Sequence, residues 1–144
     1  MAHTRAEVGV GDCAYVIGFS TALVLSRLAR EVLEQSIGQL GQFIPVTVES
    51  ERWYIFNCTR VINALTDSTD VRLVGNGRPS QLKEPSFRKS VLATEMIFKT
   101  SWPSHVSNSS QCNPPMPLFA THEFVDLVRK SGLTGFRFSE LPTA

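Results

Sequence analysis

The sequence has no marked excess of either charge. Fourteen Lys and Arg residues stand against thirteen Asp and Glu residues, which gives a formal net charge of +1 over 144 residues. Proteins that bind nucleic acid or anionic membranes usually carry a strong basic surplus, so we expect neither as a partner. The apolar fraction of 42% is close to the globular average and predicts one domain with its own hydrophobic core.

Cysteine is scarce as well. Cys13, Cys58 and Cys112 are odd in number and far apart, and they form no CxxC pair. This pattern argues against a disulfide framework and against a zinc site. We therefore expect reduced thiols, no metal and a cytoplasmic location.

Histidine motifs are also missing. None of the three histidines stands in an HExxH motif or beside a nucleophile in a known catalytic motif. His122 precedes an expected helix and is interpreted as a solvated or capping residue. The sequence therefore predicts no catalytic set and no cofactor.

Long hydrophobic runs are limited to one, "CAYVIGFSTALVLS", over residues 13–26. Glu7 and Asp12 precede it where a signal peptide would have Lys or Arg, and it is shorter than the roughly 18 apolar residues of a membrane span. We expect buried strands at "YVIGF" and "ALVLS". Residues 1–12 are polar and aperiodic, which predicts a loose N-terminal arm before a domain over residues 13–144.

Two amphipathic helices are expected. Ser26 is a suitable N-cap for a helix from Arg27 to about Ser36, which Gly38 and Gly41 would end. Its apolar face is expected to contain Leu28, Ala29, Val32 and Leu33, and its outer face Arg30, Glu31 and Glu34.

The second helix is expected between Thr121 as N-cap and Gly132 as a left-handed C′ residue, with Leu133 completing a Schellman ending. Its apolar face would be Phe124, Val125, Leu127 and Val128. "GFRFSEL" then alternates as a strand, with Phe136 and Phe138 inward.

Between the helices the pattern is mostly that of strands. "QFIPVTVESERWYIFNC" alternates on both sides of "ESE" and predicts a hairpin, although which parity is buried stays open. "TRVINALTD" fits a helical turn or a continuing strand. Further expectations are a turn at residues 67–70, a strand at "VRLV", a loop at "GNGRPS", and paired strands at "FRKSVL" and "EMIFK". The fold class is α+β, a single domain with a mainly antiparallel sheet and two helices packed on it.

A long irregular loop is expected over residues 100–117, which hold four prolines and five serines. It displays Trp102, His105 and Met116, side chains that could anchor a protein partner. The alternative for Trp102 is that it folds back to cover an edge of the core. Asp67 and Asp70 complete the candidate contact residues; a metal at this pair is conceivable, but turn chemistry explains both.

Four pieces of sequence stand in a characteristic order: a Ser-capped helix, "PVTV", "WYIFN" leading to "RVINALTD", and, after "IFK", the terminal "SGLTGFRF". From about Ala22 to Leu141 the chain resembles the immunity proteins of bacterial polymorphic toxin systems. The family was formerly described as a domain of unknown function and includes a myxobacterial immunity protein. The resemblance implies a binding protein that neutralises a cognate toxin by direct occlusion and uses no catalytic residues.

Two other functions stay open at this point. A domain of this fold could bind another protein or a small ligand without neutralising anything, since fold does not fix function. An unrecognised hydrolase could use His105 with Cys112. The expected partner is a toxin or effector encoded nearby, and a homodimer is also possible.

Overall fold

The computed structural model describes residues 11–14, 22–74, 78–103 and 117–141. Most of the expected arm and the expected strand at 15–19 lie outside these residues. The elements, in chain order, are β1 (Cys13–Ala14), β2 (Leu23–Ser26), α1 (Arg27–Ile37), the 3₁₀ turn η1 (Gly38–Leu40), β3 (Gly41–Val48), β4 (Glu51–Cys58), β5 (Val61–Ile62), β6 (Asp70–Val74), β7 (Arg78–Glu84), α2 (Lys89–Leu92), β8 (Ile97–Thr100), β9 (Phe119–Ala120) and α3 (His122–Lys130).

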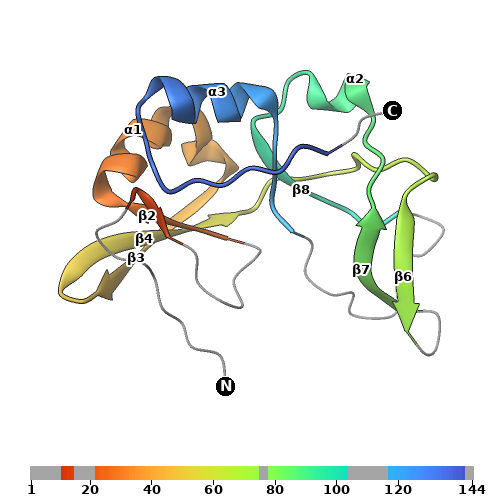
Figure 1. Cartoon of the computed structure of the whole chain (residues 1–144), viewed down its shortest axis with the longest axis horizontal. Helices are drawn as coiled ribbons and strands as arrows, with labels where there is room; N and C mark the ends of the chain where they lie inside the picture. The colour runs from red at the N-terminus through yellow and green to blue at the C-terminus, as the bar shows by residue number, and fades with distance from the viewer. Residues whose placement is uncertain (1–10, 15–21, 75–77, 104–116, 142–144) are drawn as a thin grey trace.

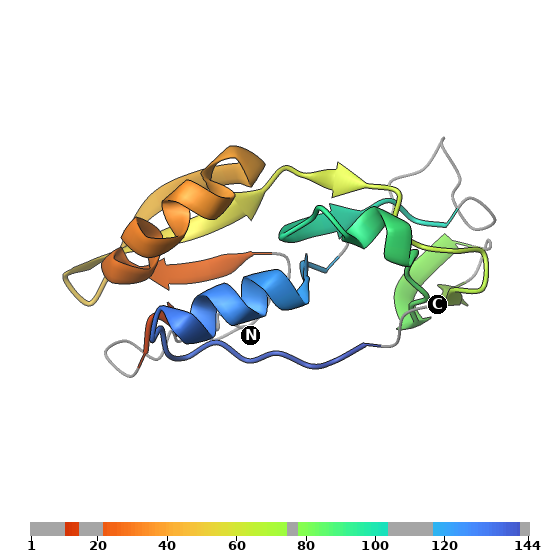
Figure 2. The same ribbon diagram turned by 90° about the horizontal axis from the view of Figure 1, so that it is seen from above.

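The strands form three small sheets. The first has the antiparallel order β1-β2-β4-β3, the second the order β5-β8-β9, and the third is the two-stranded ribbon β6-β7. Among the described pairs, only β5 and β8 run parallel. Figures 1 and 2 show α1 and α3 on the same side of the first sheet, with the β6-β7 ribbon at the other end of the molecule. The expected α+β class is confirmed.

Helix α1 begins as the sequence predicts. The Ser26 hydroxyl accepts a hydrogen bond from the Ala29 N–H at 3.1 Å, which satisfies one of the unpaired amides of the first turn. The buried face is Ala29, Leu33 and Ile37. Leu28 was expected on this face, but it is 56% exposed. At about 100° per residue, Leu28 points away from the stripe that the other three residues define.

The hairpin of β3 and β4 is confirmed, and its two faces are both apolar. Glu49 and Ser50 form the two-residue turn with φ of 48° and 70°, the left-handed pair that matches the twist of the strands. Phe56 is buried beneath α1 in the main core, whereas Trp53 is buried on the opposite face. Both sets of alternating residues in β4 are therefore partly buried, because each face of the hairpin buries its own aromatic residue.

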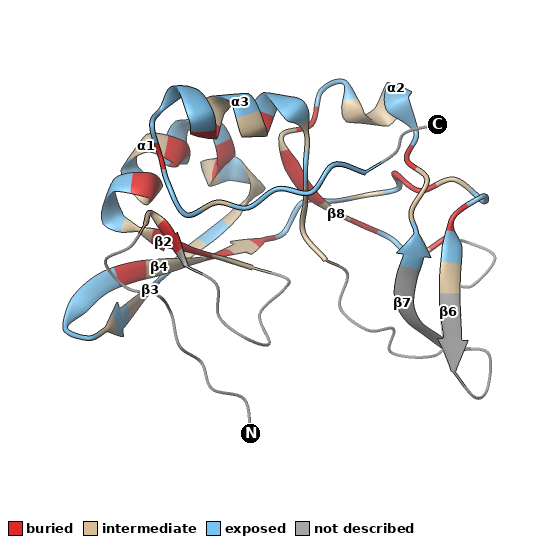
Figure 3. Cartoon of the chain, viewed as in Figure 1, coloured by how far each residue is buried: buried red, intermediate tan, exposed pale blue. Residues whose placement is uncertain are grey.

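One hydrophobic cluster contains residues of helices α1 and α3 and of the first two sheets. We call it the main core; its larger members are Leu25, Leu33, Ile37, Phe56, Ile97, Phe124 and Val128. Figure 3 shows these buried segments on α1, β2, β4, α3 and β8. Burial of each such side chain contributes about 1.5–3 kcal/mol. This cluster therefore stabilises the part of the molecule formed by α1, α3 and the first sheet, which we call the helix-bearing half.

Helix α3 differs from expectation at its start and agrees with it at its end. The Thr121 hydroxyl makes no bond to the helix and instead donates to the Glu95 carbonyl at 2.8 Å, which joins the start of the helix to the segment just before β8. At the other end Gly132 has φ of 71°, and the Leu133 N–H donates to the Val128 carbonyl at 3.3 Å. This is the expected Schellman ending, with Leu133 buried.

Three expected segments are corrected. "FRKSVL" is not a strand, because Phe87 makes a single bridge to Leu65 and the chain then turns into α2. Residues 78–80 of the expected loop belong to β7. Residues 133–141 form no strand. Phe136 and Phe138 stack with their ring centroids 6.0 Å apart and both contact Phe124, but Phe138, which was expected to face inward, is 37% exposed.

Asp12, near the start of the described chain, contacts both the start of α1 and the segment after α3. Its carboxylate accepts from the Ser26 hydroxyl and from the Thr134 N–H, each at 2.9 Å. The Asp12 N–H donates in turn to the Thr134 carbonyl at 2.9 Å. Asp12 therefore joins the start of α1 to the segment that follows α3.

Phe124→Ala tests the main core. The side chain is 1% exposed, so its removal leaves a cavity and should lower the free energy of unfolding by about 3–5 kcal/mol. Leu28→Ala is the control, since this exposed position should change stability by no more than about 0.5 kcal/mol. Chemical denaturation of both variants gives the comparison. Equal losses would show that the buried face of the helical layer is misassigned.

Candidate protein-binding site

A second hydrophobic cluster lies away from the main core. Ala64, Leu65, Phe87 and Phe98 are buried in it, and Trp102 and Phe119 are among the half-buried residues packed around it. The Phe87 and Phe119 rings meet edge to face with centroids 5.0 Å apart. Such aromatic contacts add to the stability that burial gives the cluster.

The β6-β7 ribbon is connected directly to this second cluster. Leu65 bridges Phe87, and the Thr66 N–H donates to the Ser86 carbonyl at 2.8 Å. The Ser86 N–H then donates to the Thr69 hydroxyl at 3.1 Å, so the two chains are held together where the ribbon starts. We call the second cluster, the turn at 66–69 and the ribbon together the ribbon end (Figure 1).

Trp102 lies at the ribbon end. The Ser101 N–H donates to the Ile62 carbonyl at 3.0 Å, which fixes the chain just before the indole. The side chain is half-buried and packs against the cluster that contains Leu65. The indole therefore covers the edge of the second cluster, and part of the indole surface stays exposed to solvent.

Asp67 and Asp70 lie at the foot of the ribbon. Asp67 and Ser68 form the expected turn, in which the Ser68 N–H donates to the Thr66 hydroxyl at 3.3 Å, and Asp70 begins β6. Both carboxylates are exposed. The structure thus brings these two candidates to the same end as Trp102, while His105 and Met116 lie outside the described residues.

The ribbon itself was not predicted. "VRLV" was expected as a strand, but its pairing with residues 78–84 across Gly75-Asn76-Gly77 was not. A Gly-Asn-Gly sequence between two strand-forming runs is a hairpin signal that could have revealed it. Residues 71–83 contain three cations, Arg72, Arg78 and Lys83, and no acidic residue. The inner part of the ribbon is therefore basic, whereas Asp70 and Glu84 at its foot are acidic.

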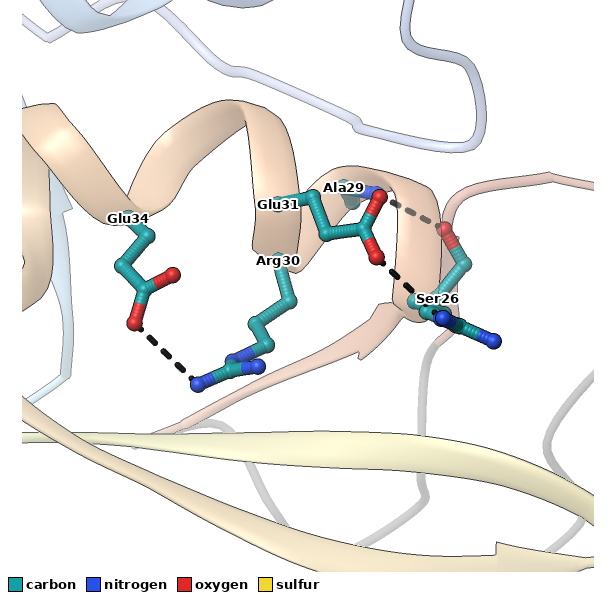
Figure 4. Close-up of polar contacts among 6 residues, drawn as sticks. Ser26, Ala29, Arg30, Glu31 and Glu34 are labelled. Carbon is teal, nitrogen blue, oxygen red and sulfur yellow. Dashed lines mark hydrogen bonds and ion pairs between the residues drawn. The ribbon is translucent and has the colours of Figure 1, made fainter.

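Arg30 of α1 makes polar contacts at the end of the molecule that carries α1 and α3. Its guanidinium lies over the Tyr54 ring, 4.9 Å from the centroid, and near the Phe43 ring at 5.5 Å. Nη2 also pairs with Glu34 at 3.1 Å (Figure 4). Arg30 was expected on the outer face of α1, but it packs against the sheet because it lies only about 60° from the middle of the buried stripe.

The thiols are placed as buried side chains. Cys13 and Cys58 are free and buried, and Cys112 lies outside the described residues. Burial raises the pKa of Cys13 to about 12 and raises the pKa of Cys58. Both thiols are therefore protonated near neutral pH and are poor nucleophiles.

The described ranges hold no group of side chains that could bind a metal ion. No three side chains of His, Cys, Asp or Glu come together there. His122 is exposed and lies 3.8 Å from the Glu140 carboxylate. Within the same part of the chain, no helix has both the length and the apolar character needed to cross a bilayer.

Comparison of the chain with protein-family models, with curated proteins and with solved structures found no match. Functional inference therefore depends on the surface just described and on the order of sequence pieces noted above. The ribbon end combines a half-buried Trp102, an aromatic cluster beneath it and, over residues 71–83, three cations without an acid.

Trp102→Ala tests the placement of the indole. Because the ring is half-buried on the second cluster, its loss should lower the free energy of unfolding by about 1–3 kcal/mol, less than for a fully buried aromatic residue. Trp102→Phe should keep most of this stability. Thermal and urea unfolding of the two variants give the comparison. An unchanged midpoint for Trp102→Ala would show that the indole does not cover the core.

Proposed function

We propose that this protein is an immunity protein, which binds and neutralises a toxin encoded beside its own gene. The pieces that resemble the family are found in α1, β3, β4, residues 60–67 with β5, β8, and the ending of α3. These pieces contribute to the main core through residues such as Leu33 and Phe56, and to the second cluster through Ala64, Leu65 and Phe98. The resemblance therefore describes a scaffold, which leaves open where a toxin would bind.

The observation that carries the proposal is the ribbon end. Residues 68–94, which include the ribbon, are not among the resembling pieces. Proteins that share a scaffold but bind different partners place their contacts in the parts that vary, supported by a rigid core. A ribbon held on an aromatic cluster fits that arrangement.

Neutralisation by occlusion requires affinity rather than chemistry. A few anchor residues, often Trp, Tyr or Arg, supply most of the binding energy at such interfaces. Trp102 at the second cluster and Arg72 and Arg78 in the ribbon are residues of these types. These anchor residues would hold the toxin in place, and the rest of the immunity protein would then block the active surface of the toxin.

Co-expression tests the function directly. Bacterial cells that express the product of the neighbouring gene together with this protein should survive, whereas cells with an empty vector should die. A catalytically inactive toxin variant serves as the control for expression burden. The two purified proteins should also form a complex in size-exclusion chromatography.

Equal death with and without this protein would contradict the proposal. Survival without complex formation would contradict direct occlusion. A stable complex with a neighbouring product that is harmless to cells would instead favour a non-neutralising accessory domain.

A further inference from the structure

The ribbon presents open strand edges. In the described part of the chain, β6 and β7 pair only with each other, so each has one outer edge without a strand partner. The N–H and C=O groups along such an edge can pair with an added strand. Peptide segments often bind in this way, through main-chain hydrogen bonds that extend a sheet.

Among the described edges, β6 is the best suited to strand addition. β1, β5 and β9 are edge strands of two residues each, too short to hold a peptide. β3 and β7 are longer, but they contain Pro45 and Pro79. Proline lacks an N–H and is a common protection of exposed edges. β6 has five residues and no proline.

The register indicates which β6 group faces outward. Leu73 is the partner of Pro79. Residues opposite each other in an antiparallel pair either exchange both hydrogen bonds or direct both N–H groups away from the partner strand. Because Pro79 cannot donate, the pair belongs to the second kind, so the Leu73 N–H is directed to the open edge of β6.

The charge of the ribbon indicates the chemistry of the partner. Residues 71–83 carry three cations without an acid, while Asp67, Asp70 and Glu84 stand at the foot. A short acidic segment can match the basic part and end before this foot. A nucleic acid, with uniform negative charge, would continue across the three carboxylates and be repelled.

We propose that β6 binds an extended, acidic segment of the toxin as a third strand of the ribbon. The inference rests on the proposed function and specifies its contact. Main-chain pairing would provide affinity, and the cations would speed association and select acidic side chains. Binding therefore weakens as salt rises.

A pair of variants at one position tests the main-chain contact. Leu73→Pro removes the outward N–H, and Leu73→Ala keeps it while shortening the side chain. Isothermal titration with an inactive toxin variant should show Kd raised about tenfold or more by Leu73→Pro and by less than about threefold by Leu73→Ala. Equal effects of the two variants would overturn strand addition.

A second pair of variants tests the charge and stays informative if Leu73→Pro disturbs the ribbon. Arg72→Glu should raise Kd about tenfold and flatten its salt dependence. Arg27→Glu is the matched control, since Arg27 is an exposed α1 residue on the helix-bearing half, and its Kd should equal that of the parent. Thermal melting checks that both variants are folded.

The outcomes separate the two proposals. If the parent protein protects cells and both ribbon variants bind the toxin as it does, the strand-addition inference is wrong and the immunity function stands. If the parent neither binds nor protects, the proposed function is wrong. Tight binding of a duplex oligonucleotide that Arg72→Glu abolishes, without toxin binding, would overturn the acidic protein partner.

Discussion

The ion pair between Arg60 and Glu95 joins the chain after β4 to the chain before β8, where the main core and the second cluster adjoin. The Glu95 side chain is only 7% exposed, and its carboxylate is held at two points, by Arg60 Nη2 at 2.6 Å and Nε at 3.3 Å. Hydrogen bonding to Glu95 also raises the pKa of Arg60. A buried carboxylate without a partner is costly, so the chain after β4 and the chain before β8 must lie together. Here β8 begins, and its consecutive residues Ile97 and Phe98 enter the main core and the second cluster, respectively.

This arrangement separates the main core from the proposed recognition site. The main core depends on α1, α3 and the first sheet, all of which are buried against one another through residues such as Leu33 and Phe124. The ribbon forms a sheet of its own, and an isolated two-stranded ribbon is only marginally stable without further contacts. The second cluster fixes the foot of the ribbon. Substitutions in the ribbon should therefore have little effect on the stability of the main core.

Local signals predicted much of the scaffold, and nonlocal pairing limited the rest. Ser26 and Gly132 mark helix ends because caps are defined by a few neighbouring residues, and the alternation around Glu49 marks the hairpin. The strand expected at residues 133–141 requires a free sheet edge that no local pattern reports, and the ribbon requires residues 70–74 and 78–84 to find each other. For the site, sequence alone selected Trp102 and the turn at Asp67 but could not show that the second cluster brings them together. His105 and Met116 stay predictions.

Hydrogen–deuterium exchange of the protein with and without the toxin tests most directly the claim that recognition lies at the ribbon end. Unpaired amides on an open strand edge exchange rapidly, and a newly added strand protects them. The account predicts slower exchange in β6 on binding, with Leu73 among the protected amides, and little change in α1 and α3. Protection confined to the two helices, with β6 exchanging as it does in the free protein, would contradict it.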